Sequence, residues 1–265
     1  VMASYGVGSP QIRNRGTIAG NVITASPAND TISPLMALNA TVKLRSKQGE
    51  RSVRLADFYL GVRKTVLQRN EMLIEISFPA LTGNQKGVYE KYALRRAQAI
   101  SLVNAASILT LEAKTISDAV ITLGSVSPTI IHAALAEQFL KGRELTPDTI
   151  DEAASLAAKD ASPITDIRGS AAYRSAMTRL MVKRGLEEIA DGSAGKKIPT
   201  RPVLLWGSRQ TQFNSSLSQG KLFEGDQAVQ TKLNRKNYAS VGGSQKTLLR
   251  WIREDALLVG TKEGC

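Results

Sequence analysis

The hydrophobic pattern of the chain changes its period once, and this change limits the folds that the chain can adopt. Three strand-like apolar runs occupy residues 88–94, 102–111 and 119–123. From about residue 132 the apolar residues recur at the spacing of an amphipathic helix. Strands followed by helices, rather than alternating with them, are typical of an α+β domain. We therefore predict a small antiparallel sheet followed by a group of helices.

The helical part is predicted to contain three helices. The first covers residues 133–140. The second begins after Thr146, which is a good N-cap residue, and has Pro147 at its first position. The third ends near residue 191. Its apolar stripe, spaced i, i+4, i+7 and i+8, consists of Tyr173, Met177, Leu180 and Met181.

The first 80 or so residues have a mixed α and β pattern. Turns rich in Gly and Asn come first, followed by an apolar stretch at residues 34–38. Strand candidates then follow at residues 41–44, 52–55 and 72–78. We predict one domain over residues 1–82 and a second over residues 83–190.

Residues 191–229 are rich in Gly, Ser, Lys and Gln and keep no hydrophobic period, so we predict a linker there. A new pattern begins near residue 230, and we assign residues 230–265 to a further, incomplete domain. The chain begins with Val1 and ends on Cys265. We expect it to be a fragment of a longer protein at both ends.

The charge and cysteine content exclude some classes of protein. The formal net charge is +12 over 265 residues, but the basic residues form no long run, which favours a solvated surface over a nucleic-acid-binding one. The chain has one cysteine, so it can form no internal disulfide. It has neither the ~18-residue apolar run of a membrane span nor a signal-peptide pattern at its start. We expect a cytoplasmic location.

The segment from Ser9 to Asn21 is the strongest candidate for a binding site. Small residues at positions 16, 19 and 20 let the backbone approach a ligand, and successive amides in a tight turn form a cradle for a phosphate. Thr17 and Asn21 add side-chain hydrogen bonds, and the Asp30 carboxylate can accept from a ribose hydroxyl or a similar diol. Composition alone leaves a sharp turn with a capping Asn as an equal alternative.

Two other glycine motifs do not meet the requirements of nucleotide sites. Gly6-Val7-Gly8 is followed by Pro10, and Gln11 stands where a dinucleotide fingerprint has its third glycine. The run from Gly243 to Thr247 has glutamine in place of the glycine that precedes the P-loop lysine. The single histidine, His132, has no neighbouring nucleophile or base in sequence and is assigned no role.

The Ser9–Asn21 segment with Asp30 resembles the second flavin-binding motif in the FAD-binding (medium) subunit of molybdenum hydroxylases. This family includes the xanthine dehydrogenases and the aerobic carbon monoxide dehydrogenases. The resemblance covers about residues 1–190. It continues through residues 34–44, the strand 72–76 closed by Pro79, the run 91–96, and the helical segments 127–129, 140–143 and 166–174.

The resemblance implies a fold and a set of cofactor contacts. Residues 1–82 would form the second lobe of a two-lobed FAD-binding domain, whose first lobe precedes residue 1, and residues 83–190 the flavoprotein C-terminal domain. Asp30 would hold the polar part of FAD, Leu73 would give a main-chain or packing contact, and Lys91 would approach the flavin. The residues that would line the FAD diphosphate are Thr17, Ile18, Ala19, Gly20 and Asn21.

The residues themselves leave alternatives, and the motif departs from the family pattern in places. By period Leu73 is a core strand residue, and Lys91 is equally a solvated strand lysine. The family usually has glycine where this chain has Ala19, so the φ angle of Ala19 must stay negative. An acidic residue commonly follows the Arg-Arg pair of the family, whereas residues 98–101 are Gln-Ala-Ile-Ser.

The last segment resembles the opening of the plant-type [2Fe-2S] domain of the same enzymes. The similarity lies in residues 232–234, 247–254 and 260–265, and it implies that Cys265 is the first cluster ligand. Such a cluster needs four ligands and this chain supplies one, so we expect the cluster only in the complete protein. The implied C-terminal fold is an incomplete β-grasp ferredoxin.

The implied function is that of an FAD-carrying electron-transfer module. Substrate would be oxidised at a molybdopterin centre on a partner large subunit, and electrons would pass through [2Fe-2S] clusters to FAD and then to NAD or another acceptor. One alternative is a stand-alone flavin reductase of related lobe architecture, which needs no cluster. A second alternative is a basic, non-catalytic scaffold that binds partner subunits or nucleic acid.

Overall fold

The computed structural model describes residues 1–95, 98–198, 227–243 and 246–262. Contacts between Cα atoms divide the chain into two compact units, Val1–Leu205 and Trp206–Cys265. Among the described residues, no helix has the length and hydrophobicity that a membrane crossing requires.

The N-terminal segment forms short helices, where the sequence predicted Gly- and Asn-rich turns. The reason is local capping: the hydroxyl of Ser9 accepts from the Ile12 amide, the Thr17 hydroxyl accepts from the Gly20 amide, and Pro10 begins a helix. The helices are α1 (Met2–Tyr5), α2 (Pro10–Arg15), α3 (Ile18–Ile23) and α4 (Ile32–Ala37).

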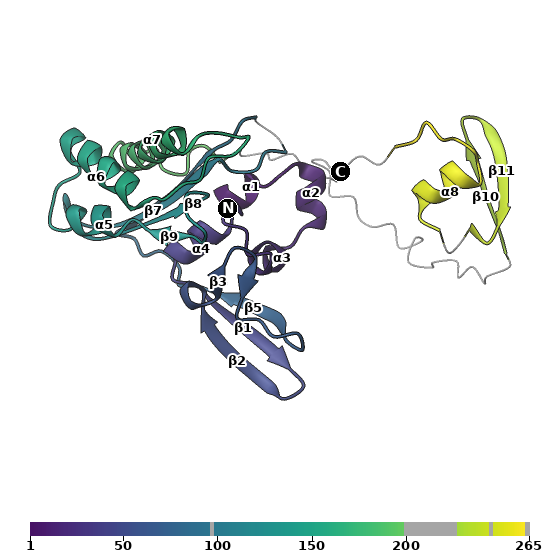
Figure 1. Ribbon diagram of the computed structural model, residues 1–265, viewed down its shortest axis with the longest axis horizontal. Helices are drawn as coiled ribbons and strands as arrows, with labels where there is room; N and C mark the ends of the chain where they lie inside the picture. Colours follow the sequence, from purple (N-terminus) through teal and green to yellow (C-terminus); the bar gives the residue numbers. More distant parts are fainter. Residues whose placement is uncertain (96–97, 199–226, 244–245, 263–265) are drawn as a thin grey trace. The chain divides into compact units, whose positions relative to one another are not determined.

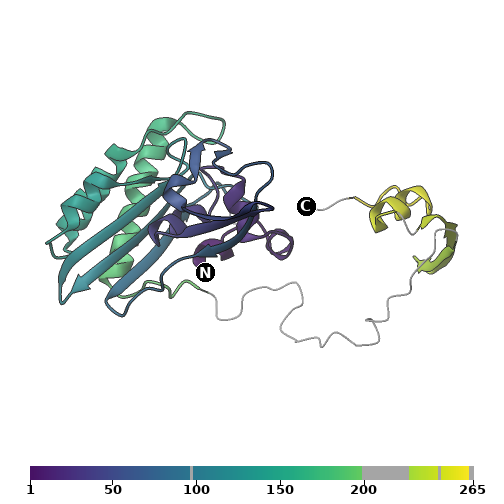
Figure 2. The ribbon, with the colours of Figure 1, turned by 90° about the horizontal axis from the view of Figure 1, so that it is seen from below.

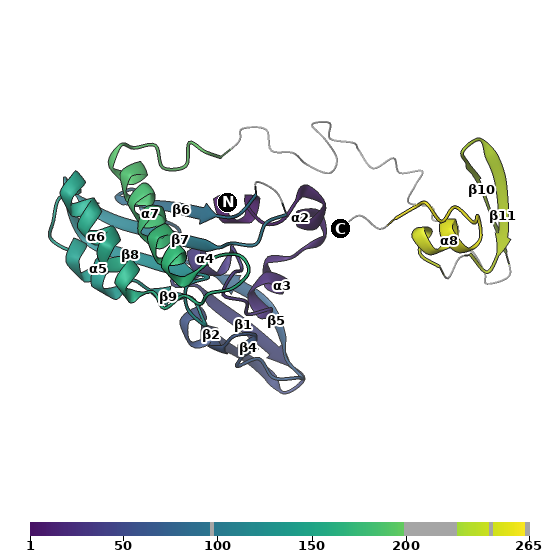
Figure 3. The same cartoon turned by 45° about the horizontal axis from the view of Figure 1, so that its top comes forward.

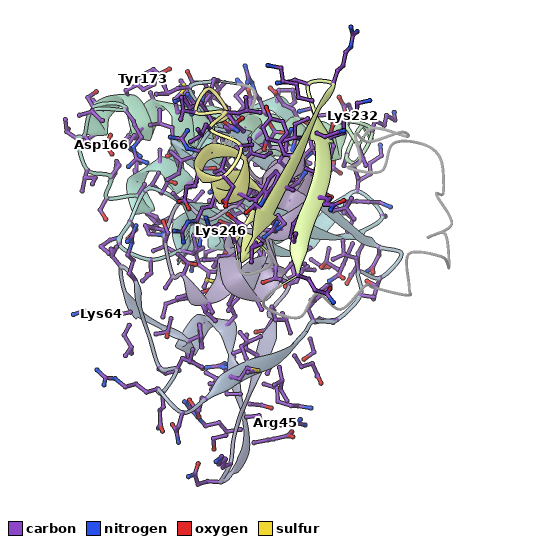
Figure 4. The ribbon with its side chains drawn as sticks, turned by 90° about the vertical axis from the view of Figure 1, so that its right-hand side faces the viewer. Arg45, Lys64, Asp166, Tyr173, Lys232 and Lys246 are labelled. Carbon is purple, nitrogen blue, oxygen red and sulfur yellow. The ribbon has the colours of Figure 1, made fainter. Side chains whose placement is uncertain are left out.

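A three-stranded antiparallel sheet follows these helices, with β1 in the middle of the order β2-β1-β5. It confirms the three strands predicted in this region. Val42 and Leu44 of β1 are fully buried, whereas the side chain of Arg45 extends from the outer end of the β1–β2 hairpin (Figure 4). The elements are β1 (Thr41–Ser46), β2 (Gly49–Arg54), the 3-10 helix η1 (Leu55–Asp57), β3 (Tyr59–Gly61), β4 (Lys64–Thr65) and β5 (Met72–Ser77).

The central sheet has four antiparallel strands in the order β6-β7-β8-β9, which confirms the predicted antiparallel sheet. Alternate residues of its strands face two different cores, since side chains of a strand alternate between the faces of a sheet. Val88 and Ala105 pack with α5–α7, whereas Tyr89 and Ala106 pack with α1 and α4. The strands are β6 (Gln85–Tyr92), β7 (Val103–Glu112), β8 (Thr115–Gly124) and β9 (Ile131–His132).

Helices α5 (Ala134–Leu140), α6 (Pro147–Asp160) and α7 (Ala171–Ala190) cover one face of the central sheet (Figures 1 and 3). The Thr146 cap and Pro147 start of α6 are as predicted, and the Thr146 hydroxyl accepts from the Thr149 amide at 3.2 Å. The α7 stripe is buried at Met181 and partly buried at Met177 and Leu180. Its first member, Tyr173, lies outside the core, and its hydroxyl lies 2.6 Å from that of Tyr92.

Polar contacts join the N-terminal helices to the central sheet. The hydroxyl of Ser33 on α4 donates a hydrogen bond to the side-chain oxygen of Asn104 on β7. The backbone carbonyl of Ser33 accepts a hydrogen bond from the Thr122 hydroxyl of β8 at 2.8 Å. The amide of Ser125 donates to the Pro27 carbonyl at 2.8 Å. These contacts explain why the two predicted domains lie in one compact unit, which Figure 2 shows from below.

The second unit contains a hairpin, β10 (Ala228–Leu233) and β11 (Lys236–Val241), followed by helix α8 (Leu248–Glu254). Asn234 and Arg235 turn the hairpin with φ angles of 48° and 67°, the left-handed values of a tight two-residue turn. Lys246, labelled in Figure 4, forms ion pairs with Asp255 at 2.7 Å and Glu254 at 3.2 Å. The charge of this lysine is thus balanced by two carboxylates of its own unit.

Candidate functional site

An open hollow of about 500 Å³ lies against helices α1, α2 and α3. Four of the five residues predicted to line a diphosphate lie on its wall, namely Thr17, Ile18, Gly20 and Asn21. The fifth, Ala19, belongs to the same helical turn. The remaining lining residues are Ser4, Val7, Ile12, Arg13, Gly16, Thr24 and Thr31.

The first turn of α3 presents open backbone donors at this hollow. The Thr17 hydroxyl accepts from the Gly20 amide at 2.9 Å, and the Thr17 carbonyl accepts from the Asn21 amide at 3.1 Å. The first amides of a helix have no acceptor within it. In the described part of the chain, no hydrogen bond occupies the amides of Ile18 and Ala19. Open amides at the start of a helix suit an anion such as a phosphate.

Gly20 leaves room for the close approach of the Thr17 side chain. A Cβ atom at Gly20 would lie 3.0 Å from the Thr17 hydroxyl oxygen, which caps the Gly20 amide. Ala19, in contrast, has a helical and therefore negative φ, so the alanine that replaces the usual glycine fits without strain. The turn therefore fits a bound diphosphate despite its departure from the family pattern.

Asn21 fixes α3 to the loop that follows it. Its side-chain oxygen accepts from the hydroxyl of Thr31 at 2.5 Å and from the Thr31 amide at 3.3 Å. Its carbonyl accepts from the side chain of Asn29 at 2.6 Å. In this arrangement Asn21 positions the turn from inside the protein.

Asp30 and Lys91 meet in a buried cluster on the central sheet. One Asp30 oxygen accepts from the Tyr89 hydroxyl at 2.9 Å and the Ser101 hydroxyl at 2.5 Å, and the other accepts from the Lys91 ammonium at 2.7 Å. Burial, followed by the neighbouring Asp30 charge, raises the pKa of Tyr89 well above its usual value. The Tyr89 hydroxyl therefore keeps its proton and donates a hydrogen bond to the carboxylate.

Lys91 uses all three of its N–H bonds inside the protein. Besides Asp30, its ammonium donates to the carbonyls of Gly6 at 2.9 Å and Ala99 at 3.0 Å. An ammonium has three donors and no more, so a direct contact to a ligand must replace or share one of these bonds. Lys91 thereby joins the α1–α2 turn to the loop before β7, where the Gln98 amide also donates to the Gly8 carbonyl.

Leu73 lies on β5, opposite Leu44 of β1, and is partly buried in the core of the smaller sheet. Helix α3 packs against β5, which places this strand beside the candidate diphosphate turn. Leu73 does not line the hollow. The structure thus gives this residue a packing contact, whereas Asp30 and Lys91 form a separate polar cluster.

Four residues of this region were not identified from the sequence as part of a site. Tyr89 had a local signal, because it lies two positions before Lys91 and therefore on the same face of the strand. Thr31 is adjacent to Asp30, but nothing in the sequence pairs it with Asn21. Arg13 belongs to the Ser9–Asn21 segment, but only the fold shows that it lines the hollow, and Ser101 is brought to Asp30 by the fold alone.

The predicted metal ligand, Cys265, lies outside the described residues. Within the described ranges, no group of three or more His, Cys, Asp or Glu side chains is placed to hold a metal ion.

Two domain families match this chain. Residues 3–81 match the FAD binding domain in molybdopterin dehydrogenase, and residues 89–189 match the CO dehydrogenase flavoprotein C-terminal domain. The chain belongs to the FAD-binding, medium-subunit family of the molybdenum hydroxylases. This membership confirms the predicted resemblance and the α+β fold, and FAD is the cofactor of the matched domain.

Relatives of known name agree with this family. The glyceraldehyde dehydrogenase medium chain of Sulfolobus acidocaldarius is 34% identical over 188 residues, covering 71% of this chain and 66% of the relative. The carbon monoxide dehydrogenase medium chain of Hydrogenophaga pseudoflava is 33% identical over 180 residues, covering 68% and 62%. The chain therefore spans slightly less than two thirds of the length of these relatives.

Solved structures show the same similarity. A carbon monoxide dehydrogenase from Hydrogenophaga pseudoflava that lacks the Mo-pyranopterin moiety of its molybdenum cofactor aligns with a TM-score of 0.66 and 34% identity. That alignment covers 69% of this chain and 63% of the other. Quinoline 2-oxidoreductase from Pseudomonas putida 86 aligns with a TM-score of 0.69 and 29% identity, covering 72% and 66%.

Proposed function

We propose that this chain is part of the FAD-carrying electron-transfer component of a molybdenum hydroxylase. The observation that carries the proposal is the first turn of α3, which has open amides and borders a hollow within a domain of FAD-binding type. Bound FAD would supply the redox chemistry, since accepting and releasing electrons is a property of the flavin. The residues of the chain bind and orient the cofactor, and none is required as a general acid or base.

The amides of Ile18 and Ala19 would hold the FAD diphosphate. Thr17, Gly20 and Asn21 would keep this turn in place, through the cap on the Gly20 amide and the bonds to Thr31. The open amides and the 500 Å³ hollow support this assignment.

The other predicted contacts come from outside the wall of the hollow. Leu73 would support the cofactor by packing, from a strand that lies beside α3. Asp30 would hold the polar part of the cofactor, and Lys91 would approach the flavin. Contact with Lys91 must replace or share one of the three hydrogen bonds that its ammonium now makes, whereas the Asp30 oxygen that accepts from Lys91 can accept a further bond.

The complete enzyme would transfer electrons between separate centres. Substrate would be oxidised at a molybdopterin centre on a large subunit, and electrons would reach FAD through [2Fe-2S] clusters before leaving to NAD or another acceptor. Relatives named as medium chains and FAD-binding subunits support such partners. Residues 230–265 would begin the cluster domain, with Cys265 as a ligand, and the complex would work in the cytoplasm.

A titration with FAD tests the cofactor assignment. FAD is added to a purified longer form of the protein that includes the expected first lobe, while the flavin fluorescence and the visible absorption band are recorded. We expect quenched fluorescence and a structured band, and weaker binding after Asn21→Ala, because the bonds to Thr31 that hold the turn are lost. Asn14→Ala is the matched control, since Asn14 is exposed on α2 and outside the hollow. Equal binding by both variants would contradict the assigned site.

A further inference from the structure

We propose that Arg13 is the cation that recognises the diphosphate of the cofactor and so selects FAD over flavins without a diphosphate. The inference rests on the proposed function, because it concerns the same hollow. Arg13 is the one charged side chain among the residues that line the hollow, all of which are described. No role in cofactor binding was assigned to it from the sequence.

The guanidinium of Arg13 is held in place from two sides. One terminal nitrogen donates to the carbonyl of Val7 at 3.0 Å. The central guanidinium carbon lies 5.0 Å from the centroid of the Tyr5 ring, within cation–π distance. A side chain fixed in this way loses less conformational entropy when a ligand arrives.

Arg13 also retains donors for a ligand. A guanidinium has five N–H bonds, and the bond to Val7 uses one of them in the described structure. Arginine binds phosphate oxygens through pairs of parallel N–H bonds, which are stronger than bonds between neutral groups. Arg13 therefore retains enough donors for a paired contact with phosphate oxygens.

The rest of the hollow supplies no compensating charge. Its other lining residues are apolar or neutral, among them Val7, Ile12 and Ile18, and the open amides of α3 carry only partial positive charge. An anion that leaves water for such a place requires a partner of opposite charge. Lys91 does not serve, because it is already paired with Asp30 outside the hollow.

Arg15 provides a matched control on the same helix. It follows Arg13 by two residues in the last turn of α2, is exposed, and does not line the hollow. Arg15→Met and Arg13→Met change the net charge equally. A difference between them therefore reports position rather than overall charge.

The test uses a longer form of the protein that includes the expected first lobe. It measures binding of FAD, riboflavin and inorganic pyrophosphate to the wild type and to Arg13→Met, Arg13→Lys and Arg15→Met. Flavins are followed by fluorescence, and pyrophosphate by the NMR shifts of the Ile18 and Ala19 amides. We expect Arg13→Met to weaken the affinity for FAD and for pyrophosphate about tenfold to about a hundredfold, which is the range for hydrogen bonds to a charged group. The affinities of Arg13→Lys should lie between those of the wild type and of Arg13→Met. The affinity for riboflavin should not change.

The outcomes separate this inference from the proposed function. Equal FAD and pyrophosphate affinities for Arg13→Met and Arg15→Met would overturn the role of Arg13 and leave the FAD site standing. Arg13-dependent pyrophosphate binding without FAD binding would support the anion role and contradict the proposed cofactor. A wild-type chain that binds neither would overturn both. Circular dichroism checks that each variant folds. Tyr5→Leu, which keeps the guanidinium of Arg13, should weaken pyrophosphate binding less than Arg13→Met does.

Discussion

The ammonium of Lys91 lies 2.7 Å from a carboxylate oxygen of Asp30, and the two residues are 61 positions apart in the sequence. Both side chains are largely buried, with 14% and 7% of their surface exposed. This ion pair joins the loop after α3 to the central sheet, and the second and third donors of Lys91 add the α1–α2 turn and the loop before β7. The candidate cofactor region is thus held together by one cation.

Replacing Lys91 with methionine should strongly destabilise the first unit. The change leaves the Asp30 carboxylate buried without its cation, and breaking a buried pair from one side costs about 3–5 kcal/mol. The free energy of unfolding, measured by urea titration with circular dichroism, should fall by about this amount. Lys43→Met is the control, because the Lys43–Glu75 pair is exposed and should contribute at most about 1 kcal/mol. Similar losses in the two variants would show that the Asp30 cluster is not a stabilising centre.

Replacing Asp166 with asparagine should reduce the sensitivity of the chain to acid. Hydrogen bonds from the side chain of Arg168, and a further one from the nearly buried Arg174, hold the pKa of Asp166 well below its usual value. A carboxyl with a depressed pKa in the folded state stabilises above its unfolded pKa of about 3.9, and this contribution is lost as the pH falls.

For Asp166→Asn we expect unfolding at pH 7 to become easier by about 2 kcal/mol, because Arg174 loses its carboxylate partner. The further loss between pH 4 and pH 2 should be smaller than in the wild type, measured by urea titration at each pH. Asp118→Asn, which breaks an exposed pair with Lys141, should change stability by at most about 1 kcal/mol. An unchanged acid profile in Asp166→Asn would exclude this carboxyl as a source of acid lability.

The single histidine allows a direct pH measurement. A hydrogen bond to the Glu137 carboxylate raises the pKa of His132 above its ordinary value of 6.5, with burial acting in the opposite direction. An imidazole whose pKa is higher in the folded than in the unfolded state stabilises the folded state fully at pH values below its unfolded-state pKa. This contribution is lost as the pH rises through the folded-state pKa. NMR titration of the ring protons should give a pKa above 6.5 that falls in Glu137→Gln. A wild-type value at or below 6.5 would refute the contact.

An alanine at Gly243 should disrupt the second unit. Its Cβ atom would lie 2.5 Å from two ring atoms of Trp251, the buried residue of α8. The ring must move, and overpacking of this kind costs about 1–3 kcal/mol. The indole NMR signal of Trp251 should shift and the unit should unfold at a lower temperature. Gly260→Ala is the control, since no atom lies within 4 Å of the added carbon, and it should leave both observables unchanged.

The strands, the helices and the α3 turn were within reach of the sequence because their signals are local. Alternating residues define β6–β8, and Thr146 with Pro147 fixes the start of α6. The Gly- and Asn-rich opening was wrongly expected to form turns, because the capping hydroxyls of Ser9 and Thr17 outweigh the weak helix preference of the glycines.

The partners of the candidate site were beyond the sequence. Asp30 was identified as a cofactor contact, but its four-residue cluster depends on strands β6 and β7 lying side by side. At the hollow, the side chain of Arg13 is held by Tyr5 at the end of α1 and by Val7 in the turn that follows. No periodic pattern in the sequence predicts either arrangement.

The sequence by itself determined the order of the main strands and helices after residue 40, the Ser9–Asn21 segment as a candidate site, and the family. These features depend on residues a few positions apart, whose preferences act through the local backbone. Only the tertiary structure decided that Lys91 is satisfied by Asp30 and that Arg13 lines the same hollow as Thr17, Gly20 and Asn21. Contacts between distant residues follow from how the sheets and helices pack, and packing is a property of the whole unit rather than of any one segment.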